Sequence, residues 1–216
     1  MNNEKGLIFA CDLQDREKAI EITKKVKKYI DGVKVNYPLI LSSDINIISK
    51  LSRYAPVISD FKIADVPHIN KIICKKAFEN GAQGVISHSF LGKKSLEVCR
   101  EVADSYNSEL FSVVEMSHSG AEKFIHPKVD DLCELSKKVG VDGVIAPGND
   151  AKRLRKVRNL LGKNLDILSP GVGFQGGEVE NALEAGANFI IVGRKIYRSN
   201  KPKEVAKELK DKINNF

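Results

Sequence analysis

The stretch VISDFKIADVPHINKIICKKAFENGAQGVISH, residues 57–88, contains the pattern that decides the fold. Its two ends, residues 57–61 and 84–88, are short runs typical of buried strands. Between them, apolar residues recur at the spacing of one helix face: Ile69, Ile72, Ile73 and Ala77. A helix between two strands returns the chain to the same edge of a sheet, so this stretch predicts two parallel strands joined by a helix.

The same unit recurs along the whole chain. Strand-like runs are found at Leu7–Cys11, Gly32–Asn36, Val57–Phe61, Gly84–His88, Leu110–Glu115, Gly143–Ala146, Leu165–Ser169 and Phe189–Val192. Helical periodicity separates them, and the longer segment Ser117–Val129 has room for a short extra helix. Eight such units predict an α/β fold, a closed (β/α)8 TIM barrel, with an open doubly wound sheet as the alternative. No linker interrupts the pattern, so we expect residues 1–216 to form one domain.

Composition excludes several classes of protein. The 216 residues are 42% hydrophobic and 29% charged, which is typical of a globular chain rather than a disordered one. Residues 1–6 lack the apolar run of a secretory signal, and no run approaches the length of a membrane span. The four cysteines lie far apart without a CxxC pair. We therefore expect a cytoplasmic protein with reduced thiols and no membrane partner.

The formal net charge of +7 raises the possibility of nucleic-acid binding. The basic residues at 24–28, 153–158 and 203–210 alternate with acidic or apolar ones at helical spacing, which predicts solvated helix faces. No stretch interleaves basic residues with stacking aromatic ones. We expect no nucleic-acid partner, although a basic barrel that binds polynucleotides without catalysis remains the alternative of another class. A phosphorylated substrate is compatible with the excess positive charge.

Charged residues gather where the predicted strands end, which is the catalytic face of a barrel. Asp12 follows the first strand, Lys34 lies on the second, and Asp60, Lys62 and Asp65 end the third. Period-2 spacing places Asp60 and Lys62 on one side of their strand. The apolar neighbours of these two residues and of Asp65 predict that this strand end is buried. Clustered buried charges indicate a functional site, so we expect these groups to converge.

A glycine-rich loop, Ser169-Pro-Gly-Val-Gly-Phe-Gln-Gly-Gly177, follows the seventh predicted strand. It contains a literal GxGxxG, but a dinucleotide fingerprint belongs to an early βαβ unit followed by an acidic residue. Here the next strand is followed by Gly193-Arg194. A glycine-rich loop after strand seven and a cation after strand eight are typical of the phosphate site of barrels. We favour that site over a merely flexible turn.

The residues around the fourth and fifth strands have less specific patterns. His88 ends the fourth strand among apolar residues, which predicts a hydrogen-bonded structural histidine. The segment Glu115-Met-Ser-His118 offers Ser117 either as a ligand contact or as the cap of a following helix. Neither a Ser/His nucleophile pair nor the spacing of a metal site is evident, so we expect no metal.

These motifs together resemble the orotidine 5′-monophosphate decarboxylase suprafamily. Asp60-Phe-Lys62-Ile-Ala-Asp65 resembles its DxKxxD signature, and the resemblance extends from Leu7 to the last helix. Further matches follow in the family's order: Asp12, Lys34, Ser117 in Glu-Met-Ser-His, Ser169-Pro-Gly-Val-Gly with Gln175-Gly-Gly, and Val192-Gly-Arg194.

The resemblance implies a homodimeric enzyme that removes CO2 from orotidine 5′-monophosphate to give UMP in pyrimidine synthesis, without cofactor or metal. It implies that Lys62 protonates the carbon that loses CO2, that Asp60 lies beside the substrate carboxylate, and that Lys34 and the neighbouring subunit's copy of Asp65 complete the charged network. Further substrate contacts are implied for Asp12 and Lys34 at the ribose, for Ser117 at the pyrimidine, and for a phosphate and loop set comprising Pro170, Gly171, Val172, Gly173, Gln175, Gly193 and Arg194.

The chain departs from the family at His68 and Ile69, where a threonine is often found after Asp65-Val-Pro. Only a backbone or apolar contact to substrate is then expected from Ile69. Ser119, where a proline is common, is expected to be silent. The nearest alternative is a magnesium-dependent sugar-phosphate enzyme with the same signature, such as hexulose-6-phosphate synthase. These relatives are expected to carry a metal-binding glutamate where this chain has Lys34, and a lysine repels a divalent cation.

Overall fold

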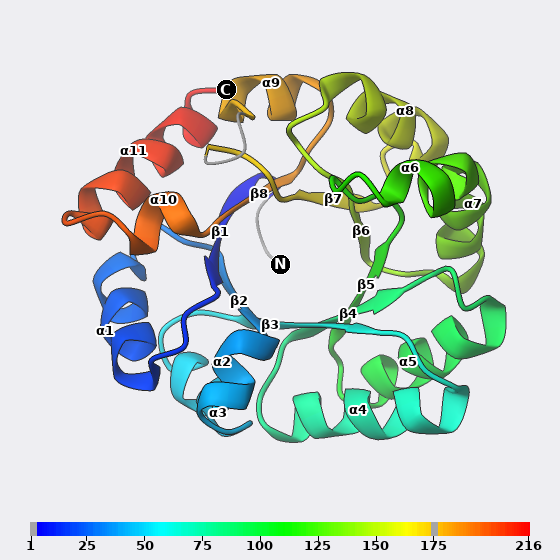
Figure 1. Ribbon diagram of the computed structural model, residues 1–216, viewed down its shortest axis with the longest axis horizontal. Coiled ribbons are helices and arrows are strands. Elements are labelled where there is room, and N and C mark those ends of the chain that lie inside the picture. The colour runs from blue at the N-terminus through cyan, green and yellow to red at the C-terminus, as the bar shows by residue number, and fades with distance from the viewer. Residues whose placement is uncertain (1–3, 174–176) are drawn as a thin grey trace.

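The structure is a computed structural model that describes residues 4–173 and 177–216. Its parallel strands follow one another around a closed barrel (Figure 1). They are β1 (Gly6–Cys11), β2 (Gly32–Asn36), β3 (Val57–Ile63), β4 (Gly84–His88), β5 (Glu109–Val113), β6 (Gly143–Ile145), β7 (Asp166–Ser169) and β8 (Phe189–Val192). Because β8 pairs with β1, the expected (β/α)8 TIM barrel is confirmed and the open doubly wound sheet is wrong.

Helices form the outer ring of the barrel in Figure 1. They are α1 (Arg16–Val26), α2 (Tyr37–Ser42), α3 (Ile47–Leu51), α4 (Pro67–Glu79), α5 (Lys93–Ser105), α6 (Ala121–Phe124), the 3₁₀ turn η1 (His126–Lys128), α7 (Val129–Val139), α8 (Ala151–Leu161), α9 (Val179–Glu184), α10 (Arg194–Tyr197) and α11 (Pro202–Asn214). The short α6 confirms the extra helix expected within Ser117–Val129. None of the helices in the described ranges is long and apolar enough to span a bilayer.

Two apolar layers hold the barrel together. One lies between strands and helices, and the other fills the barrel with residues from alternate strand positions: Ile8, Ala10, Ile58, Ile86, Phe111, Val113, Ile145, Leu168, Phe189 and Ile191. On β1 to β3 the inward-facing residues change from apolar to charged toward the carboxyl end of the strand. The register places Lys34 between Ala10 and Ile58, and Asp60 opposite Asn36. The barrel interior is therefore apolar below and charged at the carboxyl ends of these strands.

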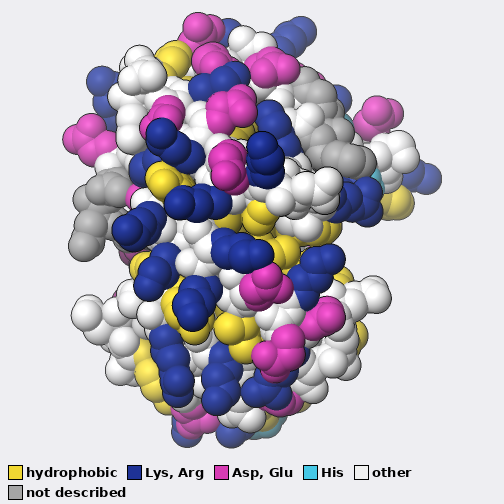
Figure 2. Space-filling view, turned by 90° about the vertical axis from the view of Figure 1, so that its left-hand side faces the viewer, with side chains coloured by type: hydrophobic (Ala, Val, Ile, Leu, Met, Phe, Trp, Pro, Cys, Tyr) yellow, Lys and Arg dark blue, Asp and Glu magenta, His cyan; other side chains and the backbone are white. Residues whose placement is uncertain are grey.

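Basic side chains are frequent on the face of the molecule that Figure 2 draws. On the face around α1 and α11, Lys and Arg alternate with Asp and Glu (Figure 2). Two of the expected solvated residues are instead structural. Arg158 donates to the carbonyl groups of Gly162 and Gly186, and Lys210 lies 2.7 Å from the Asp31 carboxylate with both side chains largely buried. Helical spacing cannot reveal the Gly186 and Asp31 partners because they come from distant segments.

Candidate active site

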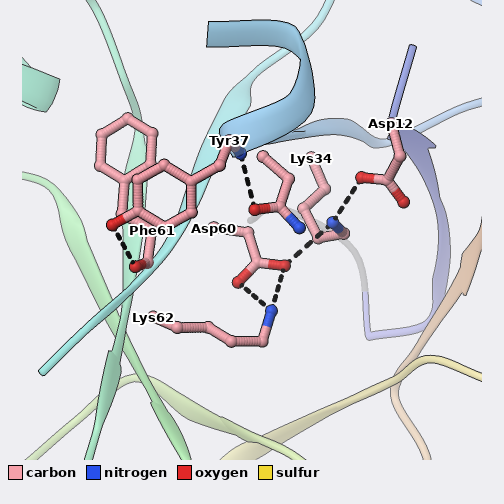
Figure 3. A network of polar contacts seen from close by, with 7 residues as sticks. Asp12, Lys34, Tyr37, Asp60, Phe61 and Lys62 are labelled. Atoms are coloured by element: carbon pink, nitrogen blue, oxygen red, sulfur yellow. Dashed lines mark hydrogen bonds and ion pairs between the residues drawn. The ribbon is translucent and has the colours of Figure 1, made fainter. Parts of the chain in front are cut away.

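Four charged side chains from three strand ends meet in one chain of ion pairs (Figure 3). Nζ of Lys34 lies 3.1 Å from Oδ1 of Asp12 and 2.9 Å from Oδ2 of Asp60. Nζ of Lys62 lies 2.8 Å from Oδ1 of Asp60. The structure thus brings Asp12, Lys34, Asp60 and Lys62 together in alternating sign.

The centre of this network is buried. Asp60 is 4% exposed and Lys34 is 6% exposed, so each depends on the other for compensation of its charge. Burial alone raises the pKa of Asp60, but the charges of Lys34 and Lys62 outweigh burial and hold this pKa below its ordinary value. Burial alone lowers the pKa of Lys34, whereas Asp60 and Asp12 together hold it above its ordinary value. Both groups are therefore charged at neutral pH.

The backbone of β3 is irregular where it carries these residues. Ser59 pairs with Val85, and Ile63 pairs with Ser87. The two pairs are four residues apart on β3 but two residues apart on β4, so β3 bulges between them. Lys62 has a φ of 42°, in the left-handed region that side chains other than glycine rarely adopt. Bulges of this kind redirect side chains beside active sites. The strain of ~1–3 kcal/mol expected at such a residue indicates that the surroundings hold Lys62 in place.

Tyr37 supports this bulge from α2. Its ring stacks on that of Phe61 with centroids 5.5 Å apart, and its hydroxyl donates to the Phe61 carbonyl at 2.8 Å (Figure 3). The residue between Asp60 and Lys62 is therefore anchored through both its side chain and its backbone.

The ion pairs line a cavity of about 270 Å³ at the carboxyl ends of the strands. Its floor is apolar, with Ile86, Val113, Ile145 and Ile191 from the barrel interior. The rest of its wall includes Ser117 and the segments after β7 and β8: Pro170, Gly171, Val172, Gly193, Arg194 and Lys195. An apolar floor with cationic groups from two parts of the wall, Lys34 and Lys62 on β2 and β3 and Arg194 and Lys195 after β8, suits a flat ligand that carries an anionic group.

The glycine-rich loop is pinned at its base. Gly171 and Gly173 have φ values of 90° and 86°, and the Gly173 N–H donates to the Gly177 carbonyl at 2.7 Å. A Cβ at Gly177 would lie 2.9 Å from the Gly171 carbonyl oxygen, so the two sides approach too closely for a side chain there. Gln175 lies outside the described residues.

Asp65 and Ile69 do not reach this cavity within the chain. The prediction that this strand end is buried is wrong beyond Ile63, because Ala64 and Asp65 are exposed. The Asp65 carboxylate accepts the N–H of Val66, and its own N–H donates to Asn70 Oδ1. Apolar neighbours in sequence do not bury a residue when they are themselves at the surface, as Ile69 is.

The structure also bears on the local roles of Ser117, for which the sequence left two alternatives open, and of His88. Ser117 does not cap α6, whose N-cap is Gly120 without a side-chain bond. His88 is neutral at pH 7, because burial and then the charge of Lys62 lower its pKa to about 4. Its Nδ1 has no hydrogen-bond partner among the described residues, so the expectation of a hydrogen-bonded histidine is wrong for this nitrogen.

Sequence patterns missed two charged residues of the cavity wall. Lys195 lines the cavity beside Arg194, and its side chain packs over Gly173, 3.1 Å from where a Cβ would lie. Glu115 lies in the wall and is 3% exposed. The signals available were a second cation after β8 and an acid at the end of the expected strand Leu110–Glu115.

The shifted pKa values predict how stability depends on pH. Asp60 has a lowered pKa in the folded state, so its stabilising contribution is present above about pH 4, the ordinary range of aspartate, and is lost as the pH falls below it. Lys34 has a raised pKa, so its contribution is present below about pH 10 and is lost as the pH rises further. In urea unfolding, we expect the stability difference between the unmodified protein and Asp60→Asn to shrink from pH 6 to pH 3. A difference that stays constant over this range would contradict the assignment.

Comparison with known proteins gives a consistent result. The family model for orotidine 5′-phosphate decarboxylase / HUMPS matches residues 5–209. The chain is 42% identical over 214 residues to the orotidine 5′-phosphate decarboxylase of Methanococcoides burtonii, covering 99% of this chain and 100% of the relative. It is 43% identical over 212 residues to that of Thermococcus kodakarensis, with 97% of each chain covered.

Solved structures agree with the sequence comparison. The crystal structure of orotidine 5′-monophosphate decarboxylase from Methanocaldococcus jannaschii, complexed with the inhibitor BMP, superposes with a TM-score of 0.93 at 40% identity. The alignment covers 98% of this chain and 100% of that one. The charged strand ends, the barrel and these matches over nearly the full length show that the chain belongs to the orotidine 5′-phosphate decarboxylase / HUMPS family.

Proposed function

We propose that this chain converts orotidine 5′-monophosphate to UMP and CO2 in pyrimidine synthesis, without a metal or cofactor. The observation that carries the proposal is the Lys62 ammonium, held 2.8 Å from the buried Asp60 in the wall of a cavity that also contains Arg194. The test is to add orotidine 5′-monophosphate to the protein and to follow the ultraviolet absorbance, which we expect to fall as the substrate is converted.

In the proposed reaction, the bond between the pyrimidine ring and its carboxylate breaks and CO2 leaves. The electron pair stays on the ring carbon, and Lys62 donates a proton from Nζ to that carbon. The resulting neutral amine takes a proton from solvent before the next turnover. One fixed ammonium thus stabilises the developing negative charge and supplies the proton.

The remaining residues have supporting roles in this proposal. Asp60 orients Lys62 and lies beside the substrate carboxylate. Lys34 and Asp12 bind ribose hydroxyls, and Ser117 contacts the pyrimidine. The phosphate is bound by Gln175 and Arg194, and the segments that follow β7 and β8 complete the substrate site with Pro170, Gly171, Val172, Gly173 and Gly193.

Binding of the remote phosphate is expected to contribute to catalysis, because such binding energy orders the reacting groups. We expect Arg194→Ala to lower kcat/KM by about 10- to 100-fold, the effect of losing one hydrogen bond to a charged group. Steady-state kinetics measure this loss. A second measurement uses a substrate without the phosphate group, to which inorganic phosphite is added. We expect phosphite to raise the rate of the unmodified protein more than that of the variant. Unchanged kcat/KM would contradict the phosphate assignment.

A homodimer is part of the proposal because the exposed Asp65 lies beside exposed apolar residues, which we propose form one surface. That surface comprises Tyr37, Leu41, Val66, Ile69, Ile72, Phe90 and Leu91, from α2, the start of α4 and the segment after β4. Contiguous exposed apolar residues typically mark protein interfaces. A second copy placed here would bring its Asp65, and the apolar side chain of Ile69, toward the first copy's cavity.

Mixing two inactive variants tests this arrangement. In a mixed dimer of Lys62→Ala and Asp65→Asn chains, the site with intact Lys62 receives intact Asp65 from the partner. We expect the refolded equimolar mixture to recover about a quarter of the unmodified activity, since half of random dimers are mixed and each has one complete site. If Asp65 acts within its own chain, no site is complete and the mixture stays inactive.

The magnesium-dependent alternative is disfavoured by the geometry around Lys34. Its ammonium lies about where a divalent cation held by Asp12 and Asp60 would have to bind, at 3.1 Å and 2.9 Å from their oxygens. A cation there would meet a buried like charge. Turnover of orotidine 5′-monophosphate that is unchanged by EDTA and by added magnesium supports the proposal.

A further inference from the structure

Glu115 is a buried acid that the proposed reaction does not use. It follows β5 by two residues and lies in the wall between the main cavity and a neighbouring cavity of about 180 Å³. Its Oε1 lies 3.0 Å from Nε2 of His126, and its Oε2 lies 3.8 Å from Nη1 of Arg153. The buried Glu115 carboxylate thus has two basic partners from separate segments, η1 and α8. Buried charges need such partners, so Glu115 is held in a defined position by the fold.

These contacts hold the backbone of Met116 from both sides. The Met116 N–H donates to Oε1 of Glu115 at 2.9 Å. The Met116 carbonyl lies 3.1 Å from Nε2 of His126, which donates to it when this nitrogen carries the proton. The Met116 side chain packs against the apolar interior of the barrel. Both peptide groups of the residue before Ser117 are therefore fixed.

Ser117 itself has no such support. Its side chain is exposed, and its hydroxyl makes no hydrogen bond with the residues the structure describes. Its position in the cavity wall thus depends on the backbone that precedes it. Arg153 extends the support to α8, because its Nε donates to Oδ2 of Asp150, whose Oδ1 caps that helix.

We propose that His126 and Glu115 are positioning residues that place Ser117 against the substrate through the Met116 backbone. The inference rests on the proposed function, in which Ser117 contacts the pyrimidine. A contact made equally in the bound substrate and the transition state changes KM and leaves kcat nearly unchanged. A merely structural role would lower the fraction of folded enzyme, and hence apparent kcat, without changing KM.

The test compares His126→Ala with His126→Gln and Lys128→Ala. Glutamine retains an N–H donor for the Met116 carbonyl. The Lys128 side chain, also in η1, pairs among the described residues with the exposed Asp131 alone. We expect His126→Ala to raise KM for orotidine 5′-monophosphate and Kd for UMP about tenfold, with kcat within about twofold. His126→Gln is expected to restore most of the affinity, and Lys128→Ala to be silent.

Hydrogen exchange at the Met116 amide gives a readout independent of activity. We expect exchange to be faster in His126→Ala than in the unmodified protein and near normal in His126→Gln. Unchanged exchange, KM and Kd in His126→Ala would overturn the inference. Failure of the unmodified protein to turn over orotidine 5′-monophosphate would instead overturn the proposed function, while the exchange data would still test whether His126 holds the Met116 backbone.

Discussion

Replacing Lys62 with alanine is expected to lower kcat for orotidine 5′-monophosphate by on the order of 10⁴-fold or more. The reason is that, in the proposed mechanism, one ammonium is both the proton donor and the cation nearest the developing carbanion. Asp60, its partner at 2.8 Å, can supply neither function. Single-turnover measurements by ultraviolet absorbance separate this loss from changes in product release.

The control for this variant is Lys152→Ala, on the exposed face of α8, which we expect to leave kcat unchanged. Lys62→Ala is expected to stay folded, because Asp60 keeps its 2.9 Å contact with Lys34. A folded Lys62→Ala protein that retains more than a tenth of the unmodified kcat would contradict the role of Lys62 as proton donor.

The second large effect is on stability. Lys34→Met is expected to lower the free energy of unfolding by about 3–5 kcal/mol, because it leaves the buried Asp60 carboxylate without its most buried partner. The double variant Lys34→Met, Asp60→Asn removes both charges, and we expect it to regain much of that loss while remaining inactive. Urea unfolding of the single variants and of the double variant measures the coupling between the two side chains.

Additive losses in the double variant would contradict this picture. They would mean that Lys34 and Asp60 stabilise the protein independently, although Nζ of one lies 2.9 Å from Oδ2 of the other. A stability gain together with lost activity is expected instead where a charged pair is kept for chemistry.

The barrel was predictable because its evidence is local. Each strand is a short apolar run, and the expected bounds agree with the structure to within about two residues, from Gly6–Cys11 to Phe189–Val192. The convergence of Asp12, Lys34 and Asp60 was also predictable, since parallel strands place their carboxyl ends at one edge. Closure between β1 and β8 depends on the whole ring of strands. The sequence pattern alone could not decide between a closed barrel and an open sheet.

Other parts of the site depend on contacts that no local pattern encodes. The bulge at Lys62 arises from the pairing of β3 with β4 and is supported by Tyr37, distant in sequence. Glu115 is held by Arg153 from α8. The exposure of Asp65 reflects a surface that the proposed second copy would cover. Periodicity reports which face of an element is apolar, but it does not report which distant segment lies against that face.

The most direct test of the central claim is the addition of orotidine 5′-monophosphate to EDTA-treated protein, with the ultraviolet absorbance followed over time. We predict that absorbance is lost at the same rate as with untreated protein, and that UMP and CO2 are formed in equal amounts. No turnover by EDTA-treated protein, together with magnesium-dependent conversion of a sugar phosphate, would contradict the claim.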